Sequence, residues 1–322
     1  METNVENLVT VFGGSGFVGR YLVRNLAKRG WRVRVAVRRP DLVGHLQPMG
    51  GVGQIQPVFA NVRDPESVKA AAANANAVVN LVGILAQSGH QSFNAIQAEG
   101  AKTVAQGAKA AGVSRFVQMS AIGADTESPS EYARTTAAGE NAAIEAFEGA
   151  VVVRPSIVFG KEDQFFNRFA KMAKLSPVVP VIGPQTRFQP VYVDDVAEFM
   201  AASVEGKVDG GTYELGGPEV ETFHALMERM LRHTRQKRAI VSVPIPVAKL
   251  QAKAFSLLPN PPITEDQIKL LQRDNVVSKE AIDEGRTFAA AAITPESMDT
   301  VLPTYLWVFR KHGQFAEPGS AA

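Results

Sequence analysis

A strand followed at once by a glycine-rich turn is the feature that most constrains this chain. Leu8-Val9-Thr10-Val11-Phe12 has the composition of a buried strand, and Gly13-Gly14-Ser15-Gly16-Phe17-Val18-Gly19 comes directly after it. The second segment contains both G-x-x-G-x-x-G and G-x-G-x-x-G and opens a helical pattern that runs to Arg29. Backbone N–H groups and the positive end of a helix at such a turn can hold a pyrophosphate. The pattern therefore favours a dinucleotide-binding βα unit over an ordinary glycine-rich turn.

Short β-branched runs alternate with helical stretches through the rest of the first half. Further strands are expected at Trp31–Val37, Ile55–Ala60, Ala77–Leu81, Arg115–Met119 and Val151–Val153. Helical periodicity covers Pro65–Ala73 and Phe93–Ala111. This alternation predicts parallel strands joined by right-handed crossovers, that is, an α/β fold with a doubly wound parallel sheet of the Rossmann type.

The second half is less regular, because proline-rich stretches interrupt it at 177–190 and 258–262. Thr212–Leu215 is expected to add a strand to the main sheet, and residues 222–233 and 264–272 are expected to be helices. The expected organisation is a dinucleotide-binding domain at 1–160 plus 191–217, a smaller and mostly helical C-terminal lobe at 161–190 plus 218–312, and a disordered tail at 313–322.

Composition excludes several kinds of site and partner. The 322 residues include no cysteine, which removes disulfides, thiol nucleophiles and Cys-based metal sites. Five histidines show no ligand spacing, so no metal site is expected. A net charge of +2 argues against a surface built for nucleic acid. Ala77–Ala86, the longest apolar stretch, falls short of the about 20 residues that a membrane span needs, and the N-terminus is expected to carry no transit peptide.

The residues after the second expected strand indicate which nucleotide is bound. An NAD-binding unit usually places Asp or Glu there, about 20 residues after the glycines, to bind the ribose 2′-hydroxyl. This chain has Arg38 and Arg39, with no carboxylate in the pair. Two guanidinium groups suit a 2′-phosphate, so we expect NADP(H) in preference to NAD(H). The alternative is that both arginines are solvated surface charges.

These motifs occur in the order found in short-chain dehydrogenase/reductases. The chain resembles the extended and atypical branches of that family through its glycine motif and through Asn61-Val62-Arg63-Asp64, Asn80-Leu81-Val82-Gly83, Ser120, Tyr132, Arg154-Pro155 and Tyr192-Val193-Asp194-Asp195. The resemblance implies that Asn61 and Val62 lie near the adenine and that Leu81, Val82 and Gly83 line the cofactor. It also implies that Ser120 and Tyr132 adjoin the cofactor, and that Pro155, Ser156 and Ile157 approach its nicotinamide end.

The catalytic motif of that family is incomplete here. Active members use Tyr-x-x-x-Lys, whereas this chain has Thr136 four residues after Tyr132. Without the lysine, a phenol of pKa about 10 is only ~0.1% ionised at pH 7. Arg134 lies about 200° around the helix from Tyr132 and cannot replace it. Ile122 stands where extended relatives often carry a second hydroxyl, so Tyr132 is expected to be vestigial.

Two stretches of the second half predict a contact surface within residues 229–258. Five cations fall within ten residues without an acid among them: Arg229, Arg232, Arg235, Lys237 and Arg238. Five apolar residues then share one helical face, with Lys249 and Lys253 off it: Val247, Leu250, Ala254, Leu257 and Leu258. Together they predict contact with an anionic membrane surface or a partner protein. The alternative is a solvated charge run beside an ordinary core helix.

Within the atypical branch, the chain looks like the NAD(P)H-binding accessory subunit of respiratory complex I (NADH:ubiquinone oxidoreductase). The resemblance rests on the broken Tyr-x-x-x-Lys motif, on Gln272–Ser278, on Ile293–Met298 and on Tyr305-Leu306-Trp307. It implies a non-catalytic, peripheral subunit that holds NADP(H) and contacts other complex I subunits. Its place would be the cytoplasmic side of a bacterial inner membrane, or the mitochondrial matrix side in a eukaryote. Two alternatives stay open: an active NADPH-dependent reductase or epimerase, and an NADP(H)-sensing regulatory protein.

Overall fold

The computed structural model describes residues 7–255, 261 and 263–313, which form two compact units. The first unit comprises Met1–Pro155, Val193–Leu215 and Lys279–Thr294, and the second comprises Ser156–Tyr192, Gly216–Ser278 and Pro295–Ala322. The tail expected to be disordered spans 313–322. Gly313 is described, and its N–H donates to the Arg310 carbonyl at 3.3 Å. The remainder, 314–322, lies outside the described residues, as do Leu257 and Leu258.

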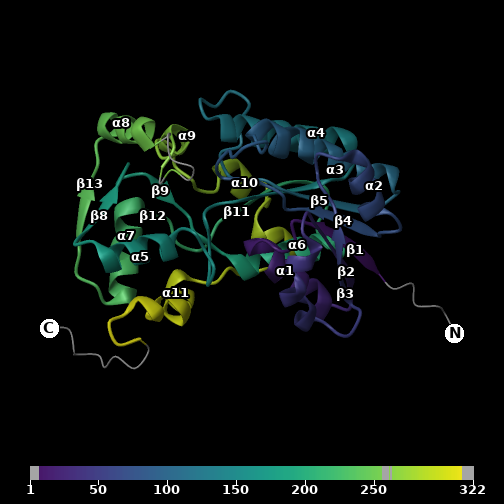
Figure 1. Ribbon diagram of the computed structural model, residues 1–322, viewed down its shortest axis with the longest axis horizontal. Coiled ribbons are helices and arrows are strands. Elements are labelled where there is room, and N and C mark those ends of the chain that lie inside the picture. Colours follow the sequence, from purple (N-terminus) through teal and green to yellow (C-terminus); the bar gives the residue numbers. More distant parts are fainter. Residues whose placement is uncertain (1–6, 256–260, 262, 314–322) are drawn as a thin grey trace. The chain divides into compact units, whose positions relative to one another are not determined.

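Among the described residues, seven strands of the first unit form one parallel sheet (Figure 1). Their spatial order is β11 (Gly211–Leu215), β6 (Val151–Pro155), β5 (Arg115–Met119), β4 (Ala77–Asn80), β1 (Leu8–Phe12), β2 (Arg32–Val37) and β3 (Ile55–Phe59). The doubly wound parallel sheet is therefore confirmed, together with the addition of the Thr212–Leu215 segment to it. Chain order reverses between β1 and β4, so the ligand crevice of this fold is expected beyond the carboxyl ends of these two strands.

Helices cover both faces of this sheet, which explains why most residues of its central strands β1, β4 and β5 are buried. On one face lie α2 (Pro65–Ala72), the π-helical turn η3 (Asn94–Ala98), α3 (Glu99–Ala110) and α4 (Glu131–Ala146). On the other lie α1 (Phe17–Lys28) and α6 (Val193–Val204) (Figure 1). The Arg24 guanidinium donates to the Asp194 carboxylate at 2.6 Å, and the Asn25 amide donates to it at 3.0 Å. These contacts join α1 to α6.

The structure differs from the expected domain boundaries at residues 279–294, which were expected in the second lobe. This segment contains α10 (Lys279–Asp283) and η4 (Phe288–Ala291) and packs with the first unit. The Glu214 N–H of β11 donates to the Arg286 carbonyl at 3.0 Å, and the Phe288 ring meets Phe199 edge-on at 5.9 Å. The segment therefore covers the β11 end of the sheet. The short helices η1 (Pro40–Leu42) and η2 (Gly44–Met49) complete the first unit.

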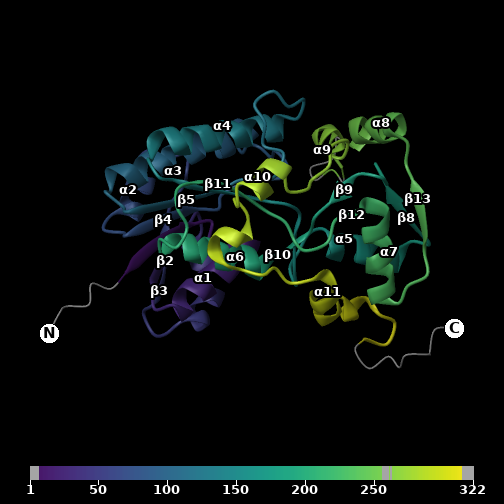
Figure 2. The ribbon, with the colours of Figure 1, turned by 180° about the vertical axis from the view of Figure 1, so that it is seen from behind.

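The second unit combines helices with pairs of short strands that the sequence did not indicate. The strand pairs are β7 (Val158–Phe159) with β10 (Val191–Tyr192), β9 (Arg187–Phe188) with β12 (Glu221–Thr222), and β8 (Val178–Val181) with β13 (Ala239–Ser242). The helices are α5 (Phe166–Leu175), α7 (Phe223–Thr234), α8 (Ile245–Phe255), α9 (Glu265–Leu270), α11 (Met298–Leu306) and η5 (Trp307–Phe309). Figure 2 shows β13 beside β8, with α8 following it.

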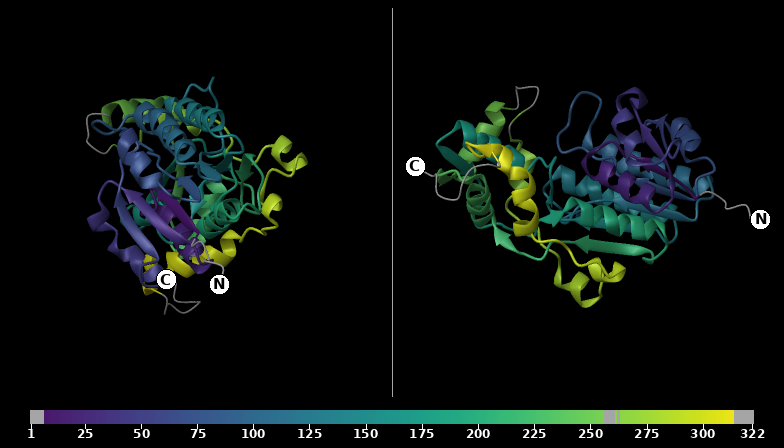
Figure 3. Two further views of the ribbon diagram at one scale, coloured as in Figure 1. Left: turned by 90° about the vertical axis from the view of Figure 1, so that its right-hand side faces the viewer. Right: turned by 90° about the horizontal axis from the view of Figure 1, so that it is seen from below.

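The core of the second unit lies among α5, α7 and α11, and Figure 3 shows α11 beside α7. Fully buried side chains there include Phe166, Met227 and Leu302. The Tyr305 hydroxyl donates to the buried Asp163 carboxylate at 2.6 Å. Burial raises the pKa of Asp163, while this bond and backbone N–H donors oppose the shift. Within the described ranges, no helix is long and apolar enough to cross a bilayer.

Candidate nucleotide-binding site

The glycine turn after β1 forms a cradle that side chains would fill. Gly13 has φ +78°, and a Cβ on it would lie 3.3 Å from the backbone of Leu81. A Cβ on Gly14 would lie 3.1 Å from Val35, and one on Gly19 would lie 2.5 Å from the Gly13 carbonyl oxygen. Only glycines therefore allow α1 to begin this close to the turn. The arrangement fits a pyrophosphate approaching the backbone.

The first turn of α1 has no side chain to neutralise its positive end. Its N-cap residue is Gly16, whose lack of a side chain leaves the turn without a side-chain cap, and no acidic residue lies in the turn. Ser15 precedes it, and Phe17 and Val18 begin the helix. The N–H groups at such an end attract anions. The predicted glycine-motif residues are thus together at the carboxyl end of β1.

The two arginines after β2 are both exposed, but they have different partners. Arg38 donates from Nη1 to the Gln91 amide oxygen at 2.9 Å. Arg39 forms a two-bond ion pair with Asp41, from Nε at 3.0 Å and from Nη2 at 2.8 Å. The hydrogen bond from Arg39 lowers the pKa of the Asp41 carboxyl. A carboxylate therefore lies beside the pair, because Asp41 follows it in η1 and binds Arg39. Within the described part of the chain, the side chain that Arg38 binds is the neutral amide of Gln91.

The predicted residues after β3 and β4 lie at the same edge of the sheet. Asn61 shapes a turn, because its side-chain oxygen accepts a hydrogen bond from the Arg63 N–H at 3.2 Å. Val62 is buried beneath Gly100, where a Cβ would lie 2.9 Å from it. After β4, the Val82 N–H donates to the Asn80 side chain at 3.1 Å, which fixes the path of the chain beside Gly13.

Leu81, Val82 and Gly83 therefore lie next to the glycine turn, and Gly83 is exposed with open space where a Cβ would point. The loop that follows continues to Gln91, the partner of Arg38.

Tyr132 lies in the first turn of α4, beside the ring of Phe93 and the hydroxyl of Thr136. Its ring meets Phe93 edge-on at 5.8 Å. Thr136 is buried, donates to the Tyr132 carbonyl at 2.7 Å and accepts from the Gln97 amide nitrogen at 2.8 Å. Burial raises the pKa of the Tyr132 phenol, and its hydrogen bond with Thr136 only partly opposes this. A phenol with a raised pKa is ionised to a smaller extent at neutral pH, so a smaller fraction of it can act as a general base.

Ser120, predicted to adjoin the cofactor, is engaged in a buried charged network. Its hydroxyl donates to the Glu140 carboxylate, which also accepts from Arg154 Nε at 2.8 Å and Nη2 at 2.6 Å. Arg154 lies 3.7 Å from Glu214 of β11 as well. The hydrogen bond with Glu140 raises the pKa of Arg154. The network joins α4 to β5, β6 and β11.

Glu140 was not predicted as a site residue, although its spacing from Tyr132 and Thr136 in the sequence could have indicated it. Tyr132, Thr136 and Glu140 are each four residues apart, and this spacing puts them on one face of a helix.

The last predicted cofactor residues fall at the boundary of the first unit. Pro155 ends β6 and accepts a hydrogen bond through its carbonyl from the Ile122 N–H at 3.0 Å. Ser156 and Ile157 belong to the second unit. There the Ser156 hydroxyl donates to the Asn275 side chain at 2.7 Å, and the Ile157 carbonyl accepts from the Val191 N–H at 2.9 Å.

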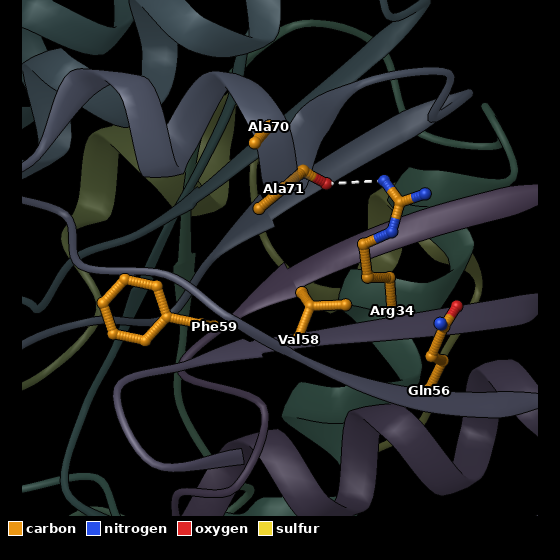
Figure 4. A pocket seen from close by; sticks show the side chains of 6 residues that line it. All are labelled: Arg34, Gln56, Val58, Phe59, Ala70 and Ala71. Carbon is orange, nitrogen blue, oxygen red and sulfur yellow. Dashed lines mark hydrogen bonds between the residues drawn. The ribbon is translucent and has the colours of Figure 1, made fainter.

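A pocket of about 270 Å³ at the β3 edge of the sheet lies away from these residues (Figure 4). Arg34 lines it and donates to the carbonyls of Ala71 at 2.6 Å and Ala73 at 2.8 Å. The Arg34 guanidinium is therefore occupied by backbone carbonyls at the carboxyl end of α2. The charged side chain that lines this pocket thus gives no sign of a ligand site. In the part of the chain that the structure describes, no group of three or more acidic or histidine residues could hold a metal ion.

The predicted contact surface at 229–258 needs one correction, at Arg229. Arg229 is buried and paired with Glu221 and, at 2.7 Å, with Asp299, so it is not a surface charge. The helix α8 packs through Ala248 and Ala252, whereas Val247 and Leu250 of the predicted apolar face are exposed. The acids that pair with Arg229 lie outside the cationic stretch, since Glu221 comes eight residues before it and Asp299 comes from α11. The exposed side chains of Val247 and Leu250 leave that part of the predicted face open.

Comparison with known proteins now identifies the family. Residues 13–156 match the NAD(P)H-binding family. The chain is also 38% identical to the Arabidopsis thaliana protein named NADH dehydrogenase (ubiquinone) 1 alpha subcomplex subunit 9, mitochondrial, over 97% of this chain and 80% of that protein. The chain belongs to this subunit 9 family. The resemblance inferred from the sequence is therefore confirmed.

One further relative and one solved structure are also similar to this chain. A ceramide reductase of Caulobacter vibrioides is 33% identical over 202 residues, which is 63% of this chain and 62% of that protein. An NADPH-dependent quinone oxidoreductase of Escherichia coli, solved with NADPH, has a TM-score of 0.72 at 16% identity and covers 92% of this chain and 98% of its own. At that identity the likeness shows the fold alone.

The network around Glu140 gives a testable consequence for stability. Glu140→Gln removes the charge that Ser120 and Arg154 donate to, and we expect the free energy of unfolding to fall by about 1.5–3 kcal/mol. Urea denaturation at pH 7 measures this change. Glu145→Gln, at an exposed position of the same helix, is the matched control and should stay within about 0.5 kcal/mol of the native chain. Equal small changes in both variants would show that the network contributes nothing measurable.

Proposed function

We propose that this protein is a non-catalytic accessory subunit of respiratory complex I that holds NADP(H) for structure or regulation. The observation that carries the proposal is the environment of Tyr132. Where active short-chain dehydrogenases place a lysine, α4 carries Thr136, which is bound to Gln97. The glycine cradle after β1 is intact. The relatives named as complex I subunits support the partner, because they match nearly the whole chain.

The location follows from the same proposal. The subunit would be peripheral, on the cytoplasmic side of a bacterial inner membrane or on the matrix side of a mitochondrial one. Binding of nucleic acid is not part of the proposal, since the cations and acids are nearly balanced in number.

Native electrophoresis of gently solubilised membranes tests the assignment. The chain is expected to migrate within a large assembly that carries NADH dehydrogenase activity. The purified chain is expected not to consume NADPH with simple carbonyl substrates. Migration as a free chain would contradict the complex I role, and would leave the nucleotide-sensing regulator as the better proposal.

A second candidate is an active NADPH-dependent reductase or epimerase, and the ceramide reductase relative favours it. Carbonyl-dependent oxidation of NADPH by the purified native chain would support this candidate over the non-catalytic one. Thr136→Lys, which restores the spacing of the family motif, gives the reference rate for such a comparison.

Preference for NADP(H) over NAD(H) is proposed to depend on Arg38 more than on Arg39. A 2′-phosphate has to compete with the Asp41 carboxylate for Arg39, whereas at Arg38 it displaces only the neutral side chain of Gln91. Charged hydrogen bonds are the stronger ones, so exchanging an amide for a phosphate at Arg38 is favourable.

Arg38→Ala is therefore expected to weaken NADPH binding about tenfold or more and to leave NADH binding unchanged. Arg39→Ala is the matched control, with a smaller loss, because its charge is already paired. Isothermal titration calorimetry with both nucleotides measures these effects. NADH binding to the native chain as tight as NADPH binding would rule out the preference.

A surface of the second unit is proposed to contact anionic lipid. No acid occurs in residues 164–193 or 229–264, and the strands β8 and β13 pair across these two stretches. Exposed apolar side chains lie on the elements of both stretches: Leu175, Val178, Val241, Val247 and Leu250. Exposed lysines accompany them: Lys171, Lys174, Lys237, Lys249 and Lys253. Apolar residues among cations suit the interface of an anionic membrane.

Sedimentation with lipid vesicles tests this surface. The native chain is expected to pellet with vesicles that contain anionic phospholipid, and less so at high salt, where charges are screened. Leu250 is 70% exposed, so Leu250→Glu should reduce pelleting without harming the fold. Leu85→Glu, at a 65% exposed position of the first unit, is the control. Equal pelleting with neutral and anionic vesicles, or none at all, would contradict the proposal.

A further inference from the structure

Gln97 lies in η3 and has one side-chain atom that the described residues do not satisfy. The residue is only 8% exposed, and its Oε1 atom has no hydrogen-bond partner among them. A buried carbonyl oxygen without a donor is costly, so such atoms normally meet a water or a ligand. The π-helical turn itself is of a kind that is frequent at functional sites.

The neighbouring hydrogen bonds fix which way this amide points. A threonine hydroxyl has one proton, and the Thr136 hydroxyl directs it to Tyr132, whose carbonyl oxygen lies 2.7 Å from Thr136 Oγ1. The same oxygen is therefore an acceptor for Gln97, which must present its Nε2 group at 2.8 Å. Gln97 Oε1 is thus held in place as an acceptor that needs a donor. Gly139 supports this arrangement, since a Cβ there would lie 2.0 Å from the Gln97 carbonyl oxygen.

The position of Gln97 indicates where the donor would come from. η3 follows β4 and α4 follows β5, so both begin on the carboxyl side of the sheet, next to the reversal between β1 and β4. Ligands of this fold bind at that crevice. A dinucleotide would place its pyrophosphate on the turn at Gly13–Gly19. Its adenosine half would then extend beyond the ends of β1 and β2, and its nicotinamide half would extend toward β4 and β5. The half toward β5 carries a ribose with two hydroxyl donors and a carboxamide.

We propose that Gln97 binds the ribose on the nicotinamide side of the dinucleotide, with Oε1 accepting a hydrogen bond from a ribose hydroxyl. The inference rests on the proposed nucleotide binding. Thr136 is the positioning residue, because it holds the Gln97 amide nitrogen. In active short-chain dehydrogenases a charged lysine at the position of Thr136 donates a hydrogen bond to the ligand. Here Gln97 and Thr136 together offer a neutral acceptor instead. The ribose is thus bound without a cation that could activate Tyr132.

Three ligands separate this contact from the rest of the site. NADPH has both the ribose and the carboxamide, 2′-phospho-ADP-ribose has the ribose alone, and 2′,5′-ADP has neither. Gln97→Met keeps the size of the side chain but removes the acceptor. By calorimetry, it should weaken NADPH and 2′-phospho-ADP-ribose about tenfold each and leave 2′,5′-ADP unchanged.

A second buried glutamine provides the matched control. Gln118 is 5% exposed, accepts from Asn80 at 2.9 Å and donates to the Met119 carbonyl at 2.7 Å, so both its polar atoms are satisfied within the protein. Gln118→Met should lower the melting temperature without altering the ratio of the three affinities. If Gln97→Met does not fold, Gln97→Asn, which withdraws the amide by one methylene, gives the same comparison.

The outcomes distinguish this inference from the proposed function. Native protein that binds none of the three ligands would overturn the proposed nucleotide binding. Native protein that binds them, with Gln97→Met affecting all three equally or none, would overturn only the role of Gln97. A loss confined to NADPH would place the contact at the carboxamide and would also overturn the ribose assignment.

Discussion

The reversal of strand order between β1 and β4 is the constraint on which the site depends. The chain leaves β1 toward α1 on one face of the sheet and leaves β4 toward η3 and α3 on the other. The two connections therefore diverge, and a crevice opens at the strand ends between them. Gly13 and Leu81 approach so closely there that a Cβ at Gly13 would crowd the neighbouring backbone. The glycine requirement is thus a consequence of topology as much as of ligand binding.

The inner face of the helix α4 combines a polar contact, a close helix approach and an ion pair. Thr136 accepts a hydrogen bond from Gln97, and Glu140 pairs with Arg154. Gly139 lies between them and allows the close approach of η3. The contacts of Thr136 are neutral, and the charge of Glu140 is balanced by Arg154. The inner face of α4 therefore needs no bound ligand to neutralise a buried charge. Thr136, which lies one helical turn after Tyr132, therefore brings no cation to the phenol.

Much of the first unit could be predicted from the sequence, because its signals are local. The Leu8–Phe12 strand and the Arg115–Met119 strand have the predicted bounds, since apolar β-branched runs end at turn residues. The strands of the second unit could not be predicted, because each has two to four residues and is defined by a distant partner. The pairing of Arg229 with Asp299 was missed for the same reason, as 70 residues separate the two in the sequence. Within the site, the orphan oxygen of Gln97 follows from tertiary contacts alone.

The placement of β11 has a consequence for how the first unit forms. Its sheet is completed only when Gly211–Leu215 pairs with β6, and the polypeptide between them runs through part of the second unit. During synthesis, β6 therefore remains an open edge, and Arg154 lacks Glu214, until some 60 further residues have been made. Contacts of such long sequence separation form late, because the loop-closure entropy must be overcome first. The nascent nucleotide-binding half is thus an incomplete sheet whose edge is exposed to association with other chains while translation continues.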